Sequence, residues 1–220
     1  MTMMKKRPGF WVNIWHAIGL SFWYLIIKGL NRVEVRGEDR IPKRGERGIM
    51  LVYNHISAID PFVIAVTSMP FFSPVWWRAP AKEELFDIPI VRNIILTWGG
   101  FPVRRGKRDL ESIDKMAAML QNSVVVIAPE GTRSTDGTLR RGKPGVGKII
   151  HDARPRKVIP VKVQGAASVL PKGRILPRVG KKITITYGPP VDLSRYEHLP
   201  GSVETSQQIV DAVMEALSKL

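Results

Sequence analysis

"IMLVYNHISAIDPF", residues 49 to 62, passes from a continuous apolar run through a polar turn to an aspartate and a proline. The run 49–53 is apolar at every position, which is typical of a strand buried on both faces of a sheet. Pro61 suits the first turn of a helix, and the preceding Asp60 is a natural N-cap. The stretch therefore predicts a buried strand, a turn that carries His55, and a helix that begins near Pro61.

Similar apolar runs recur along the chain and alternate with stretches of helical pattern. We expect strands at 32–37, 124–129, 158–165 and 182–188, and helices at 61–69, 90–97, 109–120, 144–152 and 203–218. Strands that alternate with helices predict an α/β fold, with a central and mostly buried sheet flanked by helices. A chain of 220 residues is long enough for one sizeable core, so we expect a single α/β domain over residues 31–220.

The N-terminal segment differs from the rest of the chain. Residues 8–27 carry no formal charge and follow three basic residues, and about 20 apolar residues suffice to cross a bilayer. On a helical wheel a wide apolar face lies opposite a narrow polar stripe, which comprises Asn13, His16, Ala17, Ser21, Tyr24 and Lys28. This pattern favours an amphipathic helix, within residues 1–30, that lies in one membrane leaflet. A helix that spans the membrane and a helix packed on the protein's own core are the alternatives.

The chain is strongly basic, with 34 Lys and Arg against 19 Asp and Glu and a net charge of +15. Such a balance implies an anionic partner, which is either an acidic lipid surface or a nucleic acid. The sequence lacks zinc-ligand spacing, a helix-turn-helix pattern and an aromatic RNA-binding motif, so we expect an anionic phospholipid membrane and no nucleic acid. The chain has no cysteine, which excludes disulfides, thiolate metal sites and a cysteine nucleophile.

His55 and Asp60 are the first candidates for chemistry. On a continuous helix, residues five apart lie about 140° from each other, so the two side chains meet only if His55 precedes the regular helix. The carboxylate can then accept a hydrogen bond from the histidine Nδ1–H and leave Nε2 as a base. The alternative is that Asp60 only caps the helix and that His55 is a polar loop residue.

Two further motifs can hold an anion. "APEGTRS" (128–134) follows a predicted strand, and the backbone N–H groups and guanidinium of such a turn suit a phosphate or a developing oxyanion. Its alternative is a charged surface turn in which Glu130 pairs with an arginine such as Arg133. In "WGGFPVRRGKR" (98–108), Arg104 and Arg105 can clamp a phosphate, and simple attraction to the bilayer is the alternative.

The order of the motifs NHxSxxD, GxFPVxR, PEGTRS and IPV resembles that of the 1-acyl-sn-glycerol-3-phosphate acyltransferase family of lysophospholipid acyltransferases. The likeness runs from about Arg32 to about Gly188. It implies an enzyme that moves a fatty acyl group from an acyl thioester, carried on coenzyme A or acyl carrier protein, to the sn-2 hydroxyl of lysophosphatidic acid. The product is phosphatidic acid, which belongs to phospholipid biosynthesis.

The resemblance also implies the site residues. The HX4D motif of the family places its catalytic histidine and aspartate at His55 and Asp60. The second motif places an arginine at Arg105, with Arg104 as its neighbouring candidate. The third motif corresponds to Glu130, Gly131, Thr132 and Arg133, and both motifs are linked in the family to the acceptor's phosphate. Because the lipid substrates reside in or near the bilayer, we expect the protein on the cytoplasmic face of the inner membrane.

The chemistry of these residue types agrees with the resemblance. An alcohol that attacks a thioester needs a general base near neutral pH, and a histidine oriented by a carboxylate supplies about 10²–10⁴ in rate. The thioester is already activated, so we expect no metal and no cofactor. The backbone around Gly131 is the expected oxyanion donor, and we interpret Ser57 as a turn residue rather than a nucleophile.

Two alternative functions are a lysolipid acceptor other than lysophosphatidic acid and a non-catalytic basic membrane-binding protein. The presence of His55, Asp60, Glu130 and Arg133 argues for an active enzyme. The aromatic residues that could line a groove for the acyl chain, with packing in the core as the favoured interpretation for most, are Phe62, Phe71, Phe72, Trp76 and Trp77.

Overall fold

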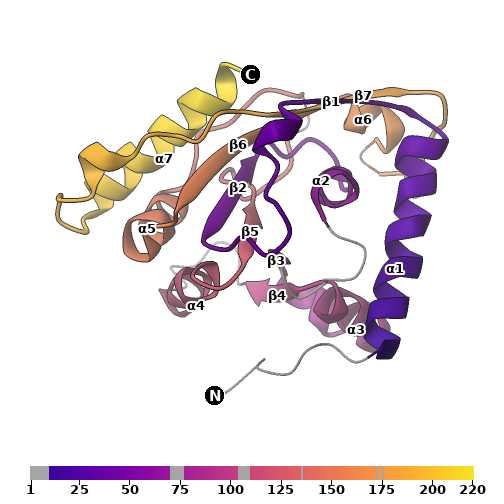
Figure 1. Cartoon of the computed structure of the whole chain (residues 1–220), viewed down its shortest axis with the longest axis horizontal. Helices are drawn as coiled ribbons and strands as arrows, with labels where there is room; N and C mark the ends of the chain where they lie inside the picture. Colours follow the sequence, from indigo (N-terminus) through magenta and orange to yellow (C-terminus); the bar gives the residue numbers. More distant parts are fainter. Residues whose placement is uncertain (1–9, 70–76, 104–109, 135, 172, 175) are drawn as a thin grey trace.

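The computed structural model describes residues 10–69, 77–103, 110–134, 136–171, 173–174 and 176–220. Within these ranges a seven-stranded sheet forms the centre of the molecule, in the order β1-β7-β6-β2-β5-β3-β4 (Figure 1). The strands are β1 (Arg32–Arg36), β2 (Ile49–Tyr53), β3 (Trp77–Lys82), β4 (Gly100–Val103), β5 (Val124–Ile127), β6 (Lys157–Gln164) and β7 (Lys182–Tyr187). Neighbouring strands are parallel, except that β7 is antiparallel to β6. The expected α/β fold is confirmed.

The five predicted strands are present, whereas β3 and β4 were not predicted from the sequence. Each of these two strands contains a proline, which weakened the strand pattern. In β3, residues 77–78 pair with β5 and residues 79–82 pair with β4. The half of β3 that carries Pro80 therefore has one neighbouring strand, so the absence of a backbone N–H is tolerated there.

Helices cover both faces of the sheet (Figure 1). They are α1 (Phe10–Tyr24), which continues as a π-helix over Leu25–Gly29, α2 (Asp60–Ser68), α3 (Pro89–Thr97), α4 (Leu110–Leu120), α5 (Pro144–Ala153), α6 (Ala166–Val169) and α7 (Val203–Ser218). Ile49 and Leu51 of β2 pack in the core cluster that includes α1 and α2, whereas Met50 and Val52 pack with α4, α5 and α7. Two-sided burial explains why residues 49–53 are apolar at every position.

Helix α1 presents apolar side chains to the outside. Trp11, Ile18 and Phe22 are 78%, 58% and 56% exposed, whereas His16, from the predicted polar stripe, is buried. The His16 ring packs against that of Trp98, with 5.1 Å between the ring centroids. Among the residues that the structure describes, Phe10–Gly29 is the one helix long and apolar enough to cross a membrane. An apolar outer face is the reverse of what a water-exposed helix shows.

Candidate active site

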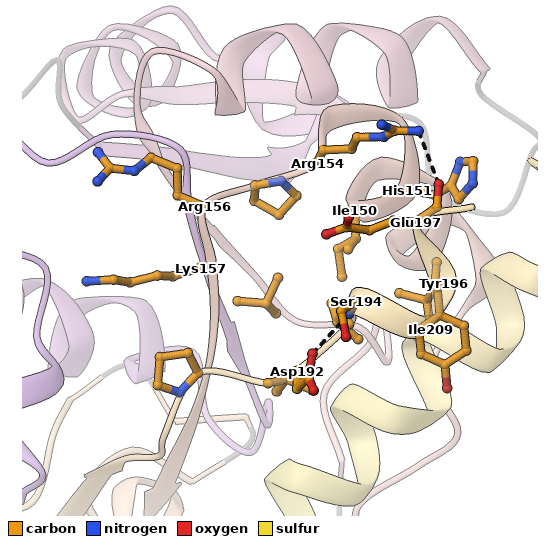
Figure 2. A pocket seen from close by; sticks show the side chains of 15 residues that line it. Ile150, His151, Arg154, Arg156, Lys157, Asp192, Ser194, Tyr196, Glu197 and Ile209 are labelled. Atoms are coloured by element: carbon orange, nitrogen blue, oxygen red, sulfur yellow. Dashed lines mark hydrogen bonds between the residues drawn. The ribbon is translucent and has the colours of Figure 1, made fainter. Parts of the chain in front are cut away.

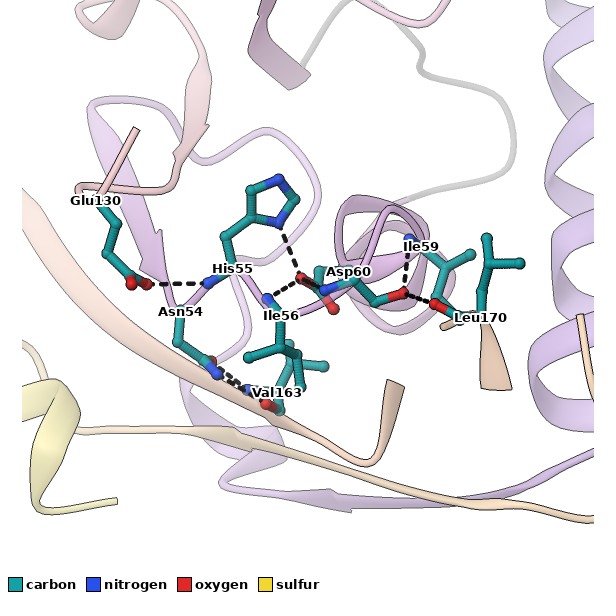
Figure 3. Close-up of polar contacts among 9 residues, drawn as sticks. Asn54, His55, Ile56, Ile59, Asp60, Glu130, Val163 and Leu170 are labelled. Carbon is teal, nitrogen blue, oxygen red and sulfur yellow. Dashed lines mark hydrogen bonds and ion pairs between the residues drawn. The ribbon is translucent and has the colours of Figure 1, made fainter. Parts of the chain in front are cut away.

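The imidazole of His55 and the carboxylate of Asp60 meet at the carboxyl edge of the sheet (Figure 3). Strand β2 ends at Tyr53 and α2 begins at Asp60, so His55 lies in the connecting turn. The distance between His55 Nδ1 and Asp60 Oδ2 is 2.9 Å. The prediction that the two side chains meet because His55 precedes the regular helix is confirmed. Nε2 is the ring nitrogen that this contact leaves for a substrate.

The Asp60 carboxylate faces back into the turn and is fully buried. Its Oδ2 also accepts hydrogen bonds from the backbone N–H groups of Ile56 (2.7 Å) and Ser57 (2.8 Å). The residue at the N-cap position of α2 is Ile59, so the prediction of Asp60 as N-cap is wrong by one residue. Burial raises the pKa of the Asp60 carboxyl, and the hydrogen bonds from His55 and Ser57 act against this rise. Two backbone donors on one oxygen fix the orientation of the carboxylate toward the imidazole.

Two neighbours of His55 hold the turn to other parts of the chain. The Asn54 side chain forms a pair of hydrogen bonds with the backbone of Val163 in β6, of 2.9 Å and 2.7 Å. The Ser57 hydroxyl donates to the carbonyl of Leu170 at 2.9 Å, which fits its interpretation as a turn residue. Sequence reasoning gave Asn54 no role. The signals for it were its place in the NHxSxxD motif and a polar residue directly after a fully buried strand.

Glu130 lies in the turn 129–134, which follows β5, and its side chain supports the backbone of His55. The residue is 4% exposed. Oε1 accepts a hydrogen bond from the His55 N–H (3.2 Å), and Oε2 accepts one from the Arg140 N–H (3.0 Å). The Ser134 N–H donates to the His55 carbonyl at 2.7 Å. Among the described residues Glu130 forms no ion pair with Arg133, so the carboxylate acts on the backbone of His55 instead.

Gly131, Thr132 and Arg133 occupy the rest of this turn. The Gly131 N–H donates to the Ala128 carbonyl at 3.1 Å, so the amide of Gly131 itself is already used within the turn. That bond removes the Gly131 amide itself from the candidate oxyanion donors, whereas the rest of the backbone around Gly131 stays a prediction. Thr132 and Arg133 are exposed and do not line the cavity beside His55. Arg104 and Arg105, the predicted second-motif residues, lie outside the described residues.

A cavity of about 640 Å³ opens beside His55. Its wall is mainly apolar and comes from β2, β3, β4, β5, the turn 129–134, α4, α5 and the start of α7. The lining includes His55, Gly131, Ile113, Met116, Lys143 and Lys148. The favoured interpretation of the aromatic residues, packing in the core, is confirmed for Trp77, which is buried in the core, and for Phe62, which packs against the core and stacks on Trp23. Phe71, Phe72 and Trp76 lie outside the described residues.

A second cavity, of about 240 Å³, lies near the start of β6 (Figure 2). Arg154, Arg156 and Lys157 lie along its wall, and the Arg154 guanidinium donates to the Glu197 carbonyl at 3.1 Å. Lys157 pairs with Ile49, the first residue of β2, whereas His55 follows the last residue of that strand. The second cavity therefore lies at the amino ends of the parallel strands, and the His55–Asp60 pair lies at their carboxyl ends.

Within the described part of the chain, no three His, Cys, Asp or Glu side chains gather closely enough to hold a metal ion. A reaction without metal or cofactor stays a prediction. The fold and the site together define a class: an α/β protein that carries a His–Asp pair at the carboxyl edge of a mostly parallel sheet, beside a mainly apolar cavity.

A protein-family model described as "Acyltransferase" matches residues 32–164, which is more than half of the chain and includes the His55–Asp60 pair. The chain therefore belongs to the acyltransferase family. The predicted family resemblance is confirmed by this match and by the relatives that follow.

The 1-acyl-sn-glycerol-3-phosphate acyltransferase LPAT1, chloroplastic, of Arabidopsis thaliana is 23% identical over 172 residues, which are 77% of this chain and 44% of that protein. The probable 1-acyl-sn-glycerol-3-phosphate acyltransferase of Mycoplasma genitalium is 27% identical over 170 residues, which are 76% of this chain and 61% of that protein. The chain thus spans about half the length of these relatives. The crystal structure of the 1-acyl-sn-glycerophosphate acyltransferase PlsC from Thermotoga maritima matches with a TM-score of 0.63 at 26% identity, over 99% of this chain and 85% of that one.

Proposed function

We propose that the protein is a 1-acyl-sn-glycerol-3-phosphate O-acyltransferase, which transfers a fatty acyl group from acyl-coenzyme A or acyl-acyl carrier protein to the sn-2 hydroxyl of lysophosphatidic acid. The single observation that carries the proposal is the 2.9 Å contact between His55 and the buried Asp60 beside a mainly apolar cavity. Membership of the acyltransferase family supports it. The names of the similar proteins, which are 1-acyl-sn-glycerol-3-phosphate acyltransferases, also support it.

In the proposed reaction His55 is the general base. Nε2 takes the proton of the acceptor hydroxyl while that oxygen attacks the thioester carbonyl, and the Nδ1–H remains hydrogen bonded to Asp60. The C–S bond then breaks, and the leaving thiolate takes the proton back from the imidazolium. Asp60 orients the ring and stabilises its transient charge. The apolar wall of the cavity, including Ile113 and Met116, accommodates an acyl chain.

We also propose that the protein binds an anionic membrane through α1 and α3. The outer face of α1 is apolar, and none of the residues of α3 is buried although six of its nine are apolar. In α3, Ile90 is 74% exposed. Large exposed apolar surfaces of this kind mark contacts with a lipid or a partner. The net charge of +15 favours an acidic lipid surface. The cytoplasmic face of the inner membrane is the proposed location.

The membrane proposal predicts that charges on the outer face of α1 release the protein from lipid. Trp11→Glu with Phe22→Glu should lower binding to vesicles of phosphatidylglycerol and phosphatidylethanolamine by at least about tenfold, measured by co-sedimentation. The matched control is Leu199→Glu with Val203→Glu, because these side chains are also exposed (40% and 64%), but Val203 begins α7 and Leu199 shortly precedes it, on the other face of the sheet from α1. Equal release by both double variants would contradict a specific role of α1.

The experiment that tests the function is thiol release from palmitoyl-coenzyme A by the purified protein in detergent, with and without lysophosphatidic acid. We expect release that depends on the acceptor, together with formation of phosphatidic acid. If coenzyme A thioesters are inactive, acyl-acyl carrier protein is the donor to test next. Failure with both donors and with a panel of lysolipid acceptors would overturn the proposed function.

A further inference from the structure

Among the described residues, the cavity beside His55 contains one lysine that has no carboxylate partner. Its described lining includes two lysines, Lys143 and Lys148, and neither Asp nor Glu. Lys148 forms an ion pair with Asp152, with 2.7 Å between Nζ and Oδ2. Lys143 is exposed at the N-terminal end of α5, and the described residues provide no carboxylate within ion-pair distance of it. Of the two ammonium groups, that of Lys143 is the one available to an anionic ligand.

Hydrogen bonds from or to their backbones connect both Lys143 and His55 to the same turn, residues 129–134. The Lys143 N–H donates to the Pro129 carbonyl at 3.0 Å. On the other side of the turn, the Glu130 carboxylate accepts from the His55 N–H, and Ser134 donates to the His55 carbonyl. The turn therefore lies between the proposed base and the lysine, and it restricts the distance between them.

Gly131 makes room in this turn for the side chain of Lys143. A β-carbon at position 131 would lie 2.9 Å from Lys143 Nζ, 3.0 Å from Cε and 3.2 Å from Cδ. The alkyl part of the lysine therefore runs across the α-carbon of Gly131. The φ of +71° at Gly131 disfavours other residues, and a side chain at this position would displace the end of the lysine.

We propose that Lys143 binds the phosphate monoester of the acyl acceptor, an inference that rests on the proposed function. An ammonium binds phosphate as a point charge, and the mainly apolar wall reduces competition from water. In lysophosphatidic acid four covalent bonds separate the sn-2 oxygen from phosphorus, so these atoms are at most about 5 Å apart. The base that holds the hydroxyl and the cation that holds the phosphate must then lie in one cavity, and His55 and Lys143 do so on either side of one turn.

Lys143→Met tests this role because it removes the charge and keeps most of the apolar stem. We expect the KM for lysophosphatidic acid to rise about 10- to 100-fold, while kcat and the KM for palmitoyl-coenzyme A change by less than about twofold. Lys143→Arg should restore most of the affinity. The matched control is Lys115→Met, which removes an ion-paired lysine of α4 that does not line the cavity and should change the KM by less than about threefold. The KM of Arg105→Ala and of Arg133→Ala for lysophosphatidic acid, measured in the same series, tests whether the arginines that the family motifs suggest also bind the phosphate.

Three results would overturn the inference. One is an unchanged KM for lysophosphatidic acid in Lys143→Met. Another is a rise in the KM for palmitoyl-coenzyme A alone, since the lysine would then bind the phosphates of the donor. The third is a fall in kcat alone, which would place the ammonium at the developing oxyanion.

A binding measurement separates this inference from the proposed function. The probes are 1-oleoyl-propanediol 3-phosphate, which lacks the sn-2 hydroxyl and cannot be acylated, and the same lipid without phosphate. The wild-type protein should bind the phosphate form at least about tenfold more tightly, and Lys143→Met should lose this difference. If this holds but no acyl transfer is found, the proposed function fails and phosphate binding by Lys143 stands. If acyl transfer is found but Lys143→Met binds both probes like the wild type, the inference fails alone.

Discussion

His55→Ala should lower acyl transfer to lysophosphatidic acid by at least about three orders of magnitude while the protein stays folded. An imidazole can take up and release a proton near neutral pH, and its removal leaves the acceptor hydroxyl without the proposed base. The fold should persist because the side chain is 14% exposed and Asp60 keeps its hydrogen bonds from Ile56 and Ser57. The measurement is thiol release with and without acceptor, beside a thermal unfolding curve for each variant.

The matched control for this variant is His151→Ala. His151 Nδ1 also lies near a carboxylate, 3.3 Å from Asp152 Oδ1, but it lines the second cavity at the opposite edge of the sheet. Its removal should leave acyl transfer within about twofold of the wild type. Asp60→Asn is the companion variant and should lower kcat without a comparable rise in either KM, since Asp60 acts through the imidazole. Near-normal turnover in His55→Ala would exclude His55 as the base.

Gly147→Ala should destabilise the protein by about 3 kcal/mol or more, since the backbone of α7 packs directly against this glycine of α5. A β-carbon on Gly147 would lie 1.7 Å from the Ser206 carbonyl oxygen and 2.6 Å from its carbon. Both are backbone atoms, so no side-chain rotation relieves the contact and the two helices have to move apart. The free energy of unfolding from urea titration measures the effect.

Gly145→Ala, two residues earlier in α5, is the control for this effect. The nearest atom to its new β-carbon is Ile113 Cδ1 at 3.5 Å, an ordinary van der Waals contact. Alanine is also the better helix former by about 1 kcal/mol, so this variant should be as stable as the wild type or slightly more stable. A Gly147→Ala variant within about 1 kcal/mol of the wild type would show that α5 and α7 pack differently.

The sequence alone predicted five of the seven strands of the sheet and the contacts that depend on local geometry. Continuous apolar runs indicated β2 and β5 because strands buried on both faces cannot alternate. The spacing of His55 and Asp60 around a helix start correctly predicted that they meet, since both positions belong to one short turn. The order of four motifs likewise indicated the acyltransferase family before the fold was known.

The tertiary structure decided the contacts between residues that are far apart in the chain. Glu130 supports the backbone of His55 from 75 positions away, and Asn54 binds Val163 across 109 positions. Lys143 runs across Gly131 only because the turn after β5 returns to the start of α5. Periodicity and residue spacing indicate the local geometry within one segment of the chain. The contacts between distant segments depend instead on which strands are neighbours in the sheet. The order β6-β2-β5, which brings them together, is set by packing of the whole core and is not encoded in any one of these segments.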